Sequence, residues 1–456
     1  MLSSYSHSTL NKAVFRKLVG LSLVLLCSIS VLSIVIGAFD ISRPHLELLT
    51  ALNFLALAAV LAQVLPRGIW SISFIFYVTF GVFHAGLILA SAMGGITDDD
   101  IVYQISFWFD THYNTHAIVL INLAFIGYAF ASILFSDNVS LGTQKEDVAY
   151  CRRAFHIGGI GLIGSIFIFF AIAFSTGAAS SYGAYLSVVD SIPIVGILFT
   201  YIYLLIGLTL VLVVVSYRPG FGVYYFLAFF VWSAMAFRLG LRGEVMFPSA
   251  VALALLARRG KPINGALMVV LITVFLVAAS IVKNARVSGD FSGDMSLNPM
   301  NTVAELGSSL RAVTEVVKWR DTGDDLLLGA SYWAPIERQV ALVLPQMSRL
   351  PALEDDRLLN VKVIRVSGPI GFSLVAEAYI NFGGTGVFII AMIFAYLFAK
   401  LDNKPSTLST DVYIGVALVP VFVMIRNSFA HVPIQIVLGV VLVAGCLFLA
   451  KRNRSM

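Results

Sequence analysis

Long apolar runs recur along the whole chain and set its architecture. A membrane-spanning helix needs about 20 mostly apolar residues, and runs near that length predict about twelve spans. They cover residues 18–38, 46–65, 70–93, 115–135, 155–175, 192–216, 223–237, 245–257, 265–282, 384–401, 412–425 and 432–450. The alternating hydrophobicity of an outer-membrane barrel is absent. The pattern therefore predicts an all-α integral membrane protein, whose first run is too long for a signal-peptide core and is expected to stay as an anchor.

One long segment interrupts this series of spans. Residues 283–383 are far more than a connecting loop requires, and loops of that length are usually functional. Helical patterns are predicted within it at 302–318 and at 334–344, the second with a proline near its first turn. The apolar stretch 370–383 is broken by glycines and polar residues, which favours a re-entrant or interfacial element. We therefore divide the chain into helices one to nine at 1–282, a large loop at 283–383 and helices ten to twelve at 384–456.

The basic residues support this topology and give it an orientation. With the N-terminus inside, sixteen Lys and Arg fall on the inner segments, and the short outer loops hold only Arg43, Arg238, Arg242 and Arg426. The inner set is Lys12, Arg16, Lys17, Arg67, Lys145, Arg152, Arg153, Arg218, Arg258, Arg259, Lys261, Lys400, Lys404, Lys451, Arg452 and Arg454. An excess of positive charge marks the cytoplasmic side. Both termini are therefore expected in the cytoplasm, and the 283–383 loop in the periplasm.

Composition sharpens the class of protein. Only 12% of the 456 residues are charged and 59% are hydrophobic, whereas a soluble domain carries about 25% charged residues. A soluble enzyme, a disordered chain and a secreted disulfide scaffold are thereby excluded, and the lipid bilayer is an expected partner. The net charge of +5 is explained by the inner loops and does not indicate nucleic acid. The three cysteines show no disulfide or metal pattern.

Three outer arginines lie where the chain is too short to carry them clear of the headgroups. Arg238 and Arg242 stand in the turn between two short spans, four residues apart, so that on a helix they would share a face. Arg426 begins a similar turn that ends at His431. Arginine at membrane depth normally faces a wet cavity or a partner, and it binds phosphate oxygens bidentately. The pattern favours an outer anion site; the alternative is snorkelling arginines, or an Arg242–Glu244 pair that only fixes the turn.

Other candidate site residues lie in or just after the long loop. Arg286 and Arg338 are basic candidates for substrate binding, although a solvated loop charge is the alternative for each. Glu377 lies within an apolar stretch, which suits a general base or a partner for a sugar hydroxyl; an ion pair is the alternative. His431 is a second candidate base. Tyr379 and Asn381 flank Glu377 as candidate sugar-binding residues, and an aromatic residue of the membrane interface is the alternative for Tyr379.

Some chemistry has no signal in the sequence. No phosphate-binding GxxxxGK[ST] motif occurs, so ATP is not expected to drive the reaction. No His/Cys cluster has zinc-ligand spacing. The histidine inside the third span, His84, is expected to be a hydrogen-bonded core residue rather than a catalyst.

The chain resembles the Wzy-type O-antigen polysaccharide polymerases, bacterial inner-membrane proteins with many spans and one large periplasmic loop before the last helices. The more specific similarities are the turn Arg242-Gly243-Glu244 and the piece Gly329-Ala330-Ser331-Tyr332 running on to Leu344-Pro345. The third is the block from Ala376 to Gly383, which contains Glu377, Tyr379 and Asn381. An arginine followed eleven residues later by glycine occurs in the loops of some members, and neither Arg238 nor Arg242 fits it.

The resemblance implies a glycosyltransferase that uses an oligosaccharide repeat unit on undecaprenyl pyrophosphate and needs no metal, nucleotide sugar or other cofactor. Arg238, Arg242 and Arg426 would neutralise the pyrophosphate leaving group, and Glu377 or His431 would take the acceptor proton. A protein that regulates chain length is a further possible partner.

Two other functions remain open at this stage. A ligase of the O-antigen type, which transfers finished glycan to a lipid core, shares the large outer loop and the outer arginines. A secondary transporter or flippase shares the count of twelve spans with both ends inside. Paired, broken spans in two matching halves are not visible in the sequence, which argues against the transporter.

Overall fold

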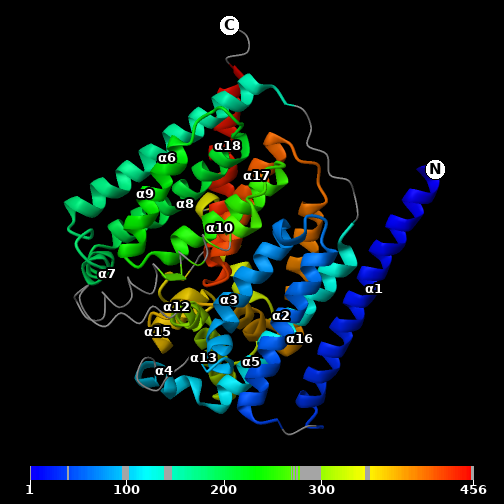
Figure 1. Ribbon diagram of the computed structural model, residues 1–456. Helices are drawn as coiled ribbons and strands as arrows, with labels where there is room; N and C mark the ends of the chain where they lie inside the picture. The colour runs from blue at the N-terminus through cyan, green and yellow to red at the C-terminus, as the bar shows by residue number, and fades with distance from the viewer. Residues whose placement is uncertain are drawn as a thin grey trace. The chain divides into compact units, whose positions relative to one another are not determined.

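The computed structural model describes residues 2–38, 41–94, 102–137, 146–268, 299–344 and 350–452, together with 270, 273, 276 and 277. Within these residues the chain is helical and contains no β-strand (Figure 1). The all-α architecture predicted from the apolar runs is therefore confirmed for the part of the chain that is described. The helices form two compact units, one from residues 1–140, 300–404 and 424–433, the other from 141–299, 405–423 and 434–456.

The first unit is built on five long helices and carries the helices of the large loop. The long helices are α1 (Leu2–Val35), α2 (Arg43–Val64), α3 (Ile72–Ala92), α5 (His112–Phe135) and α16 (Leu374–Asp402). The shorter elements are η1 (Gly68–Trp70), α4 (Val102–Phe109), α12 (Pro299–Leu306), η2 (Gly307–Ser309), α13 (Leu310–Asp321), α14 (Ala330–Val343), α15 (Leu359–Ser367) and η3 (Phe429–His431). Helix α5 packs along α16, and both contact α13 (Figure 1). Helix α13 of the loop is thus anchored on two long helices of this unit.

The core of the first unit combines stacked aromatic rings with a few buried polar links. Phe76 packs against Tyr128 and Phe398, with ring centroids 5.7 and 4.6 Å apart. The amide of Asn122 donates to Thr50 Oγ1 at 2.7 Å, which joins α5 to α2. Asp402 accepts hydrogen bonds from the backbone of Ile72 and Ser73 at 3.0 and 3.1 Å. A carboxylate at a helix N-terminus satisfies amides that have no partner within the helix, so the end of α16 caps α3.

The second unit contains seven further helices whose bounds are described. They are α6 (Val148–Ser175), α7 (Tyr182–Ser191), α8 (Pro193–Ser216), α9 (Tyr224–Arg238), α10 (Arg242–Arg258), α17 (Leu408–Val423) and α18 (Val432–Arg452). Helix α8 is central to this unit, because it packs against α6, α10 and α17. A Cβ on Gly415 of α17 would lie 2.4 Å from Val211 of α8, so these two helices require a glycine where they meet.

Eight helices of the described residues are long and apolar enough to cross a membrane: α1, α2, α3, α5, α6, α8, α16 and α18. The protein is therefore a multi-pass membrane protein. Helices α9, α10 and α17 match three further predicted spans but are shorter, and most of the span predicted at 265–282 lies outside the described residues. The total of twelve and the periplasmic location of the loop stay predictions.

The large loop is folded much as its helical patterns predict, with different boundaries. The pattern at 302–318 corresponds to α12, η2 and α13. The helix predicted at 334–344 begins earlier, at Ala330, and Pro335 lies inside it at the sixth position, where proline removes one helical hydrogen bond. The stretch predicted to be broken at 370–383 begins with non-helical backbone, including Gly371 with φ +75°, and is helical from Leu374. Inside this helix the non-helical geometry is confined to Gly383, with φ +69°. Only glycine adopts such a backbone readily.

Candidate functional site

Glu377 lies in the first turn of α16, inside the protein. Ser373 caps this helix by accepting hydrogen bonds from the backbone N–H groups of Val375 and Ala376. The same hydroxyl lies 2.8 Å from Nε2 of His84, whose Nδ1 is 3.0 Å from the carbonyl of Phe80. His84 is therefore a hydrogen-bonded core histidine, as expected. The cap fixes the start of α16 and with it the direction of the Glu377 side chain, which is 1% exposed.

The Glu377 carboxylate joins two segments that are far away in sequence. Its Oε1 accepts a hydrogen bond of 2.8 Å from the hydroxyl of Ser331, and its Oε2 accepts one of 2.7 Å from the backbone N–H of Phe429. A buried carboxylate is costly unless it is hydrogen-bonded, and here each oxygen has a donor. The ion pair considered as an alternative is not among its described interactions.

Asn381, one turn further along α16, completes the link to Ser331. Its amide donates to Ser331 Oγ and to the carbonyl of Glu377, both at 2.7 Å, and its Oδ1 accepts from the backbone N–H of Gly329 at 2.9 Å. Backbone N–H groups of Leu327 and Leu328 bond the carbonyls of Ile380 and Asn381. These two carbonyls lie directly before Gly383, where the helix breaks and leaves carbonyls without helical partners. We call this meeting of residues 327–332, 377–382 and 426–431 the Glu377 junction.

The turn that carries Arg426 and His431 is held at the junction by its backbone. The carbonyl of Arg426 accepts from the N–H of Phe372 at 3.0 Å, and the ring of Phe429 lies edge-on to Tyr332 at 5.5 Å. Burial, with Glu377 nearby, raises the pKa of Tyr332 well above its usual value. Arg426 is partly exposed and His431 is exposed. The structure therefore brings together Glu377, Asn381 and the turn that carries Arg426 and His431. All four residues were predicted as site candidates.

Arg238 and Arg242 lie in the second unit, at a turn between two helices. Helix α9 ends at Arg238, Gly240 has φ +75°, and α10 begins at Arg242. The expectation that they share a helix face is wrong, because the chain reverses between them. Arg238 is exposed, whereas Arg242 is buried in the first turn of α10. That these two residues form one anion site with Arg426 stays a prediction.

Arg338, one of the two loop arginines predicted to bind substrate, has partners within the loop. Arg338 donates to the carbonyl of Leu350 at 2.7 Å and forms an ion pair of 3.6 Å with Asp355. Arg357 binds the same aspartate at 2.9 Å and also Glu337 at 2.9 Å. Arg338 is thus part of an ion-pair cluster within the loop rather than a solvated charge, and its role in substrate binding stays a prediction. Arg286 lies outside the described residues.

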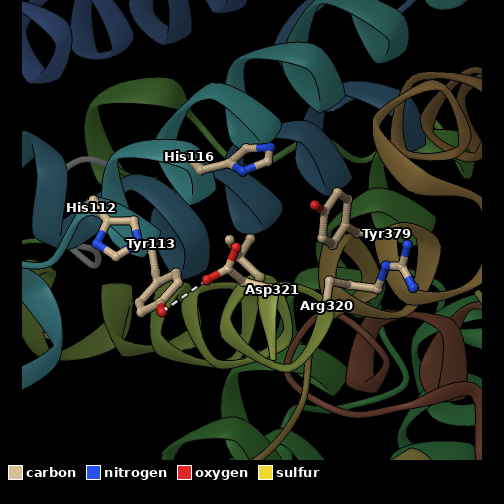
Figure 2. Close-up of a pocket in the computed structure, with 7 residues that line it drawn as sticks. His112, Tyr113, His116, Arg320, Asp321 and Tyr379 are labelled. Atoms are coloured by element: carbon tan, nitrogen blue, oxygen red, sulfur yellow. Dashed lines mark hydrogen bonds between the residues drawn. The ribbon is translucent and has the colours of Figure 1, made fainter. Parts of the chain in front are cut away.

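Tyr379 points away from the junction, into a pocket. Figure 2 shows this pocket, which is lined by Tyr379 and by residues of α5 and α13. Its other lining residues are His112, Tyr113, His116, Val317, Arg320 and Asp321. Sequence reasoning missed these residues and also Ser331. The local signal for the pocket was weak: His112 and His116 are one helical turn apart, but their partners on α13 follow some 200 positions later.

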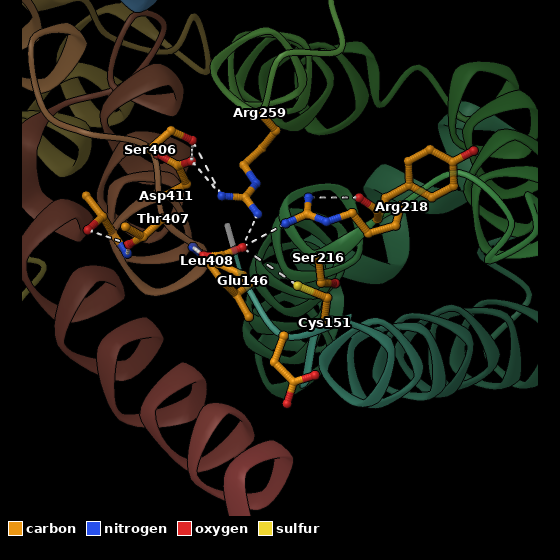
Figure 3. Close-up of polar contacts among 12 residues, drawn as sticks. Glu146, Cys151, Ser216, Arg218, Arg259, Ser406, Thr407, Leu408 and Asp411 are labelled. Atoms are coloured by element: carbon orange, nitrogen blue, oxygen red, sulfur yellow. Dashed lines mark hydrogen bonds and ion pairs between the residues drawn. The ribbon is translucent and has the colours of Figure 1, made fainter. Parts of the chain in front are cut away.

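A second polar cluster lies within the second unit and includes Arg218 and Arg259, which were predicted to lie on the inner side (Figure 3). Glu146 Oε2 accepts from Arg218 at 2.7 Å and from Arg259, and its Oε1 accepts from the backbone N–H of Leu408. The fully buried pair Arg258 and Asp411, 2.9 Å apart, joins α10 to α17. Burial and the neighbouring arginines lower the pKa of Lys261 to about 8. These charges, which were predicted to lie on the inner side, hold helix ends together within this unit.

Among the described residues, no group of three or more His, Cys, Asp or Glu side chains is arranged to hold a metal ion. The polar groups at the Glu377 junction are one carboxylate, one amide and one hydroxyl, beside an arginine and a histidine on the adjoining turn. This set can bind an anion and accept a proton.

The comparisons with known proteins identify the family of the chain. The profile of the family described as O-antigen polysaccharide polymerase Wzy matches residues 18–453. Protein CapE of Staphylococcus aureus is 26% identical over 379 residues, which cover 80% of this chain and 80% of CapE. No solved structure matches at a significant level. Because the profile matches nearly the whole chain, the protein belongs to the O-antigen polysaccharide polymerase Wzy family.

Proposed function

We propose that this polymerase joins oligosaccharide repeat units carried on undecaprenyl pyrophosphate, at the periplasmic face of the bacterial inner membrane. In the reaction, the bond between the donor sugar and the pyrophosphate breaks and the pyrophosphate leaves with the bonding electrons. A new glycosidic bond forms to a hydroxyl of the acceptor unit, whose proton passes to a protein base. Such a transfer balances without a metal, a nucleotide sugar or an oxidant.

The observation that carries the proposal is the Glu377 junction. Two of the pieces that resemble the family, at Gly329–Tyr332 and Ala376–Gly383, meet there through side-chain hydrogen bonds of 2.7–2.9 Å. The backbone of Phe429 adds the third segment, so the carboxylate fixes the turn that carries Arg426 and His431. A reaction at a membrane surface requires such charged groups to be held in place before substrate arrives.

In this proposal Arg426 binds the pyrophosphate, and Arg238 and Arg242 are further candidates for phosphate binding. Guanidinium groups match phosphate oxygens with two parallel hydrogen bonds. Charge that develops on the leaving oxygens is stabilised by donors already in place, and removing one such donor typically costs about 10²–10³ in rate.

For the acceptor proton we assign Glu377 and His431 separate roles. Glu377 is enclosed and both its oxygens accept hydrogen bonds, which supports a positioning role for it. His431 is exposed on the turn, and its Nε2 lies 3.2 Å from the amide of Asn360, which orients the ring. An oriented, accessible imidazole suits a general base.

The test is to delete the gene in its bacterium and analyse the surface glycan on a gel. We expect the ladder to collapse to a single repeat unit and to return with the wild-type gene. Arg426→Ala and His431→Ala should fail to restore it at normal membrane levels. Arg365→Ala is the matched control, because Arg365 is exposed on the loop and bound to Asp356. Finished polymer left on the carrier lipid would indicate a ligase instead, and unchanged glycans would contradict both.

A further inference from the structure

The pocket beside Tyr379 is a cavity of about 250 Å³ within the first unit. Its walls come from the start of α5, the end of α13 and one residue of α16 (Figure 2). Ligand pockets for drug-sized molecules measure roughly 300–1,000 Å³. This one lies below that range, so it has room for a single ring rather than for a whole oligosaccharide.

The lining is chemically mixed in a way that suits a polyhydroxylated ring. Tyr113 donates a hydrogen bond of 3.1 Å to Asp321 Oδ2, which leaves further acceptor sites on this carboxylate. The rings of His116 and Tyr379 meet edge to face at 5.5 Å and form an aromatic corner. Hydroxyl groups of a sugar would bond the carboxylate and the imidazoles, while its C–H face would pack on Tyr379.

The charges of the pocket favour a neutral ligand. Asp321 and the adjacent Arg320 carry opposite charges, and Arg320 also donates to the carbonyl of Asp324. Asp321 would repel an anionic ring, and Arg320, the cation among the lining residues, already donates to a backbone carbonyl. A neutral ring can use both groups as hydrogen-bond partners.

The position of Tyr379 on α16 connects this pocket to the Glu377 junction. Residues four apart share a helix face and residues two apart do not. Glu377 and Asn381 both bond Ser331, and Tyr379 between them lines the pocket. One turn of α16 therefore contributes residues to the Glu377 junction on one face and to the pocket on another face.

We propose that this pocket binds one neutral sugar ring of the lipid-linked glycan and thereby selects which repeat unit the polymerase accepts. This inference rests on the proposed function. Asp321 is the main hydrogen-bond acceptor for the ring and Tyr379 is its stacking surface.

The first test measures polymerisation kinetics with the full chain in lipid nanodiscs and a lipid-linked repeat unit as substrate. Asp321→Asn should raise KM about tenfold and leave kcat within about twofold, because hydrogen bonds to a charged group contribute about 1.5–3 kcal/mol. Tyr379→Ala should raise KM similarly, and Tyr379→Phe, which keeps the ring, only slightly. Asp325→Asn is the matched control, since Asp325 is an exposed carboxylate that does not line the pocket. An unchanged KM in both Asp321→Asn and Tyr379→Ala would overturn the inference.

The second test does not depend on turnover. Saturation-transfer NMR on the same nanodiscs uses methyl glucoside, methyl galactoside, methyl N-acetylglucosaminide and, as the anionic comparison, glucuronate. We expect a signal from at least one neutral glycoside that disappears in Asp321→Asn and persists in Asp325→Asn. The absence of any signal that depends on Asp321, or a stronger signal from glucuronate, would overturn the inference. If the wild-type chain makes no polymer, the proposed function fails, and the NMR result still decides whether the pocket binds sugar.

Discussion

At the scale of single residues, three hydrogen bonds around Ser331 and Glu377 decide which substitutions the Glu377 junction tolerates. Ser331 accepts from Asn381 and donates to Glu377, so its hydroxyl is used in both directions. The N–H of Phe429 has the other carboxylate oxygen as its acceptor. Buried polar groups of this kind are costly when one partner is removed and the others stay.

Glu377→Ala and Glu377→Gln separate positioning from catalysis. The alanine leaves the Ser331 hydroxyl and the Phe429 N–H without this acceptor, and each such group costs about 1–3 kcal/mol. We therefore expect a clear fall in Tm and loss of polymer. The glutamine keeps the shape and one acceptor oxygen, so we expect partial activity and an unchanged pH profile. Assays over a range of pH check this: a general base would instead lose about 10²–10⁴ in rate with glutamine, and that loss in a stably folded variant would contradict the positioning role.

The ion-pair cluster of the loop predicts a pH-dependent stability. Hydrogen bonds from Arg357 hold the pKa of Asp355 below its usual value of about 3.9. The stabilisation is therefore fully present above that value and is lost as the pH falls through the lower pKa of the folded state. Hydrogen exchange of residues 350–360, corrected for intrinsic rates, should accelerate as the pH falls from about 5 to about 2. Asp355→Asn should exchange faster at pH 5 and show a much smaller change with pH; equal behaviour of both chains would contradict this.

The sequence identified the residues of the junction better than it identified their partners. Glu377 is a charged residue in an apolar stretch. Arg426 and His431 stand in a turn that directly follows an apolar run. Each residue could therefore be recognised from its neighbours in the sequence. Ser331 pairs with Glu377 across 46 positions, and no local pattern signals such a contact. Arg338 was a candidate because it is basic, but its charge is satisfied by Asp355, which only the folded loop brings to it.

At the scale of elements, a very close backbone contact of the first unit lies between α3 and the loop. A Cβ on Gly86 of α3 would lie 2.3 Å from the carbonyl oxygen of Val303, and one on Gly307 would lie 2.0 Å from the backbone N of Leu87. Real atoms do not approach so closely, and backbone cannot move aside as a flexible side chain does. Two glycines therefore allow η2 to lie directly on α3.

Gly86→Ala should separate these two elements. We expect a loss of about 1–3 kcal/mol or more in the free energy of unfolding, typical of overpacking, and a lower Tm in detergent. Gly164→Ala on α6 is the matched control, because a Cβ there meets nothing within 4 Å and alanine favours a helix over glycine by about 1 kcal/mol. A Gly86→Ala variant as stable as Gly164→Ala would show that the two backbones are not in contact.

Most helices were predictable because a run of about 20 apolar residues indicates a membrane-spanning helix by itself. Helix ends and short helices carry no such signal. Helices α4, α7 and α15 contain 8, 10 and 9 residues, too few for a clear periodic pattern. The turn between Arg238 and Arg242 was predicted from the shortness of the runs on both sides. The shared face was wrong, because it assumed a helix across Gly240, whose positive φ ends α9.

At the scale of the whole molecule, several ion pairs within each unit join residues from segments that are predicted to lie on the same membrane side. In the second unit, Glu146 meets Arg218, Arg259 and the start of α17, all from segments predicted to be inside. In the first unit, Arg67 meets Asp402 at 3.7 Å, again both from the predicted inner side. Arg43 and Asp110, from two predicted outer loops, meet at 3.4 Å. Segments that the positive-inside rule places on one side are thus found in contact in every one of these pairs.

This agreement predicts how the chain is labelled from the two sides of the membrane. In a background without Cys27, Cys151 and Cys446, single cysteines are introduced by Asp325→Cys in the large loop and by Lys404→Cys after α16, both at exposed positions. A membrane-impermeant maleimide should label the first in intact spheroplasts and the second only after lysis. Because α16 lies between the two positions, opposite labelling requires that it cross the membrane. Labelling of both positions before lysis would make α16 re-entrant, and the reverse pattern would invert the chain and place the Glu377 junction away from a periplasmic substrate.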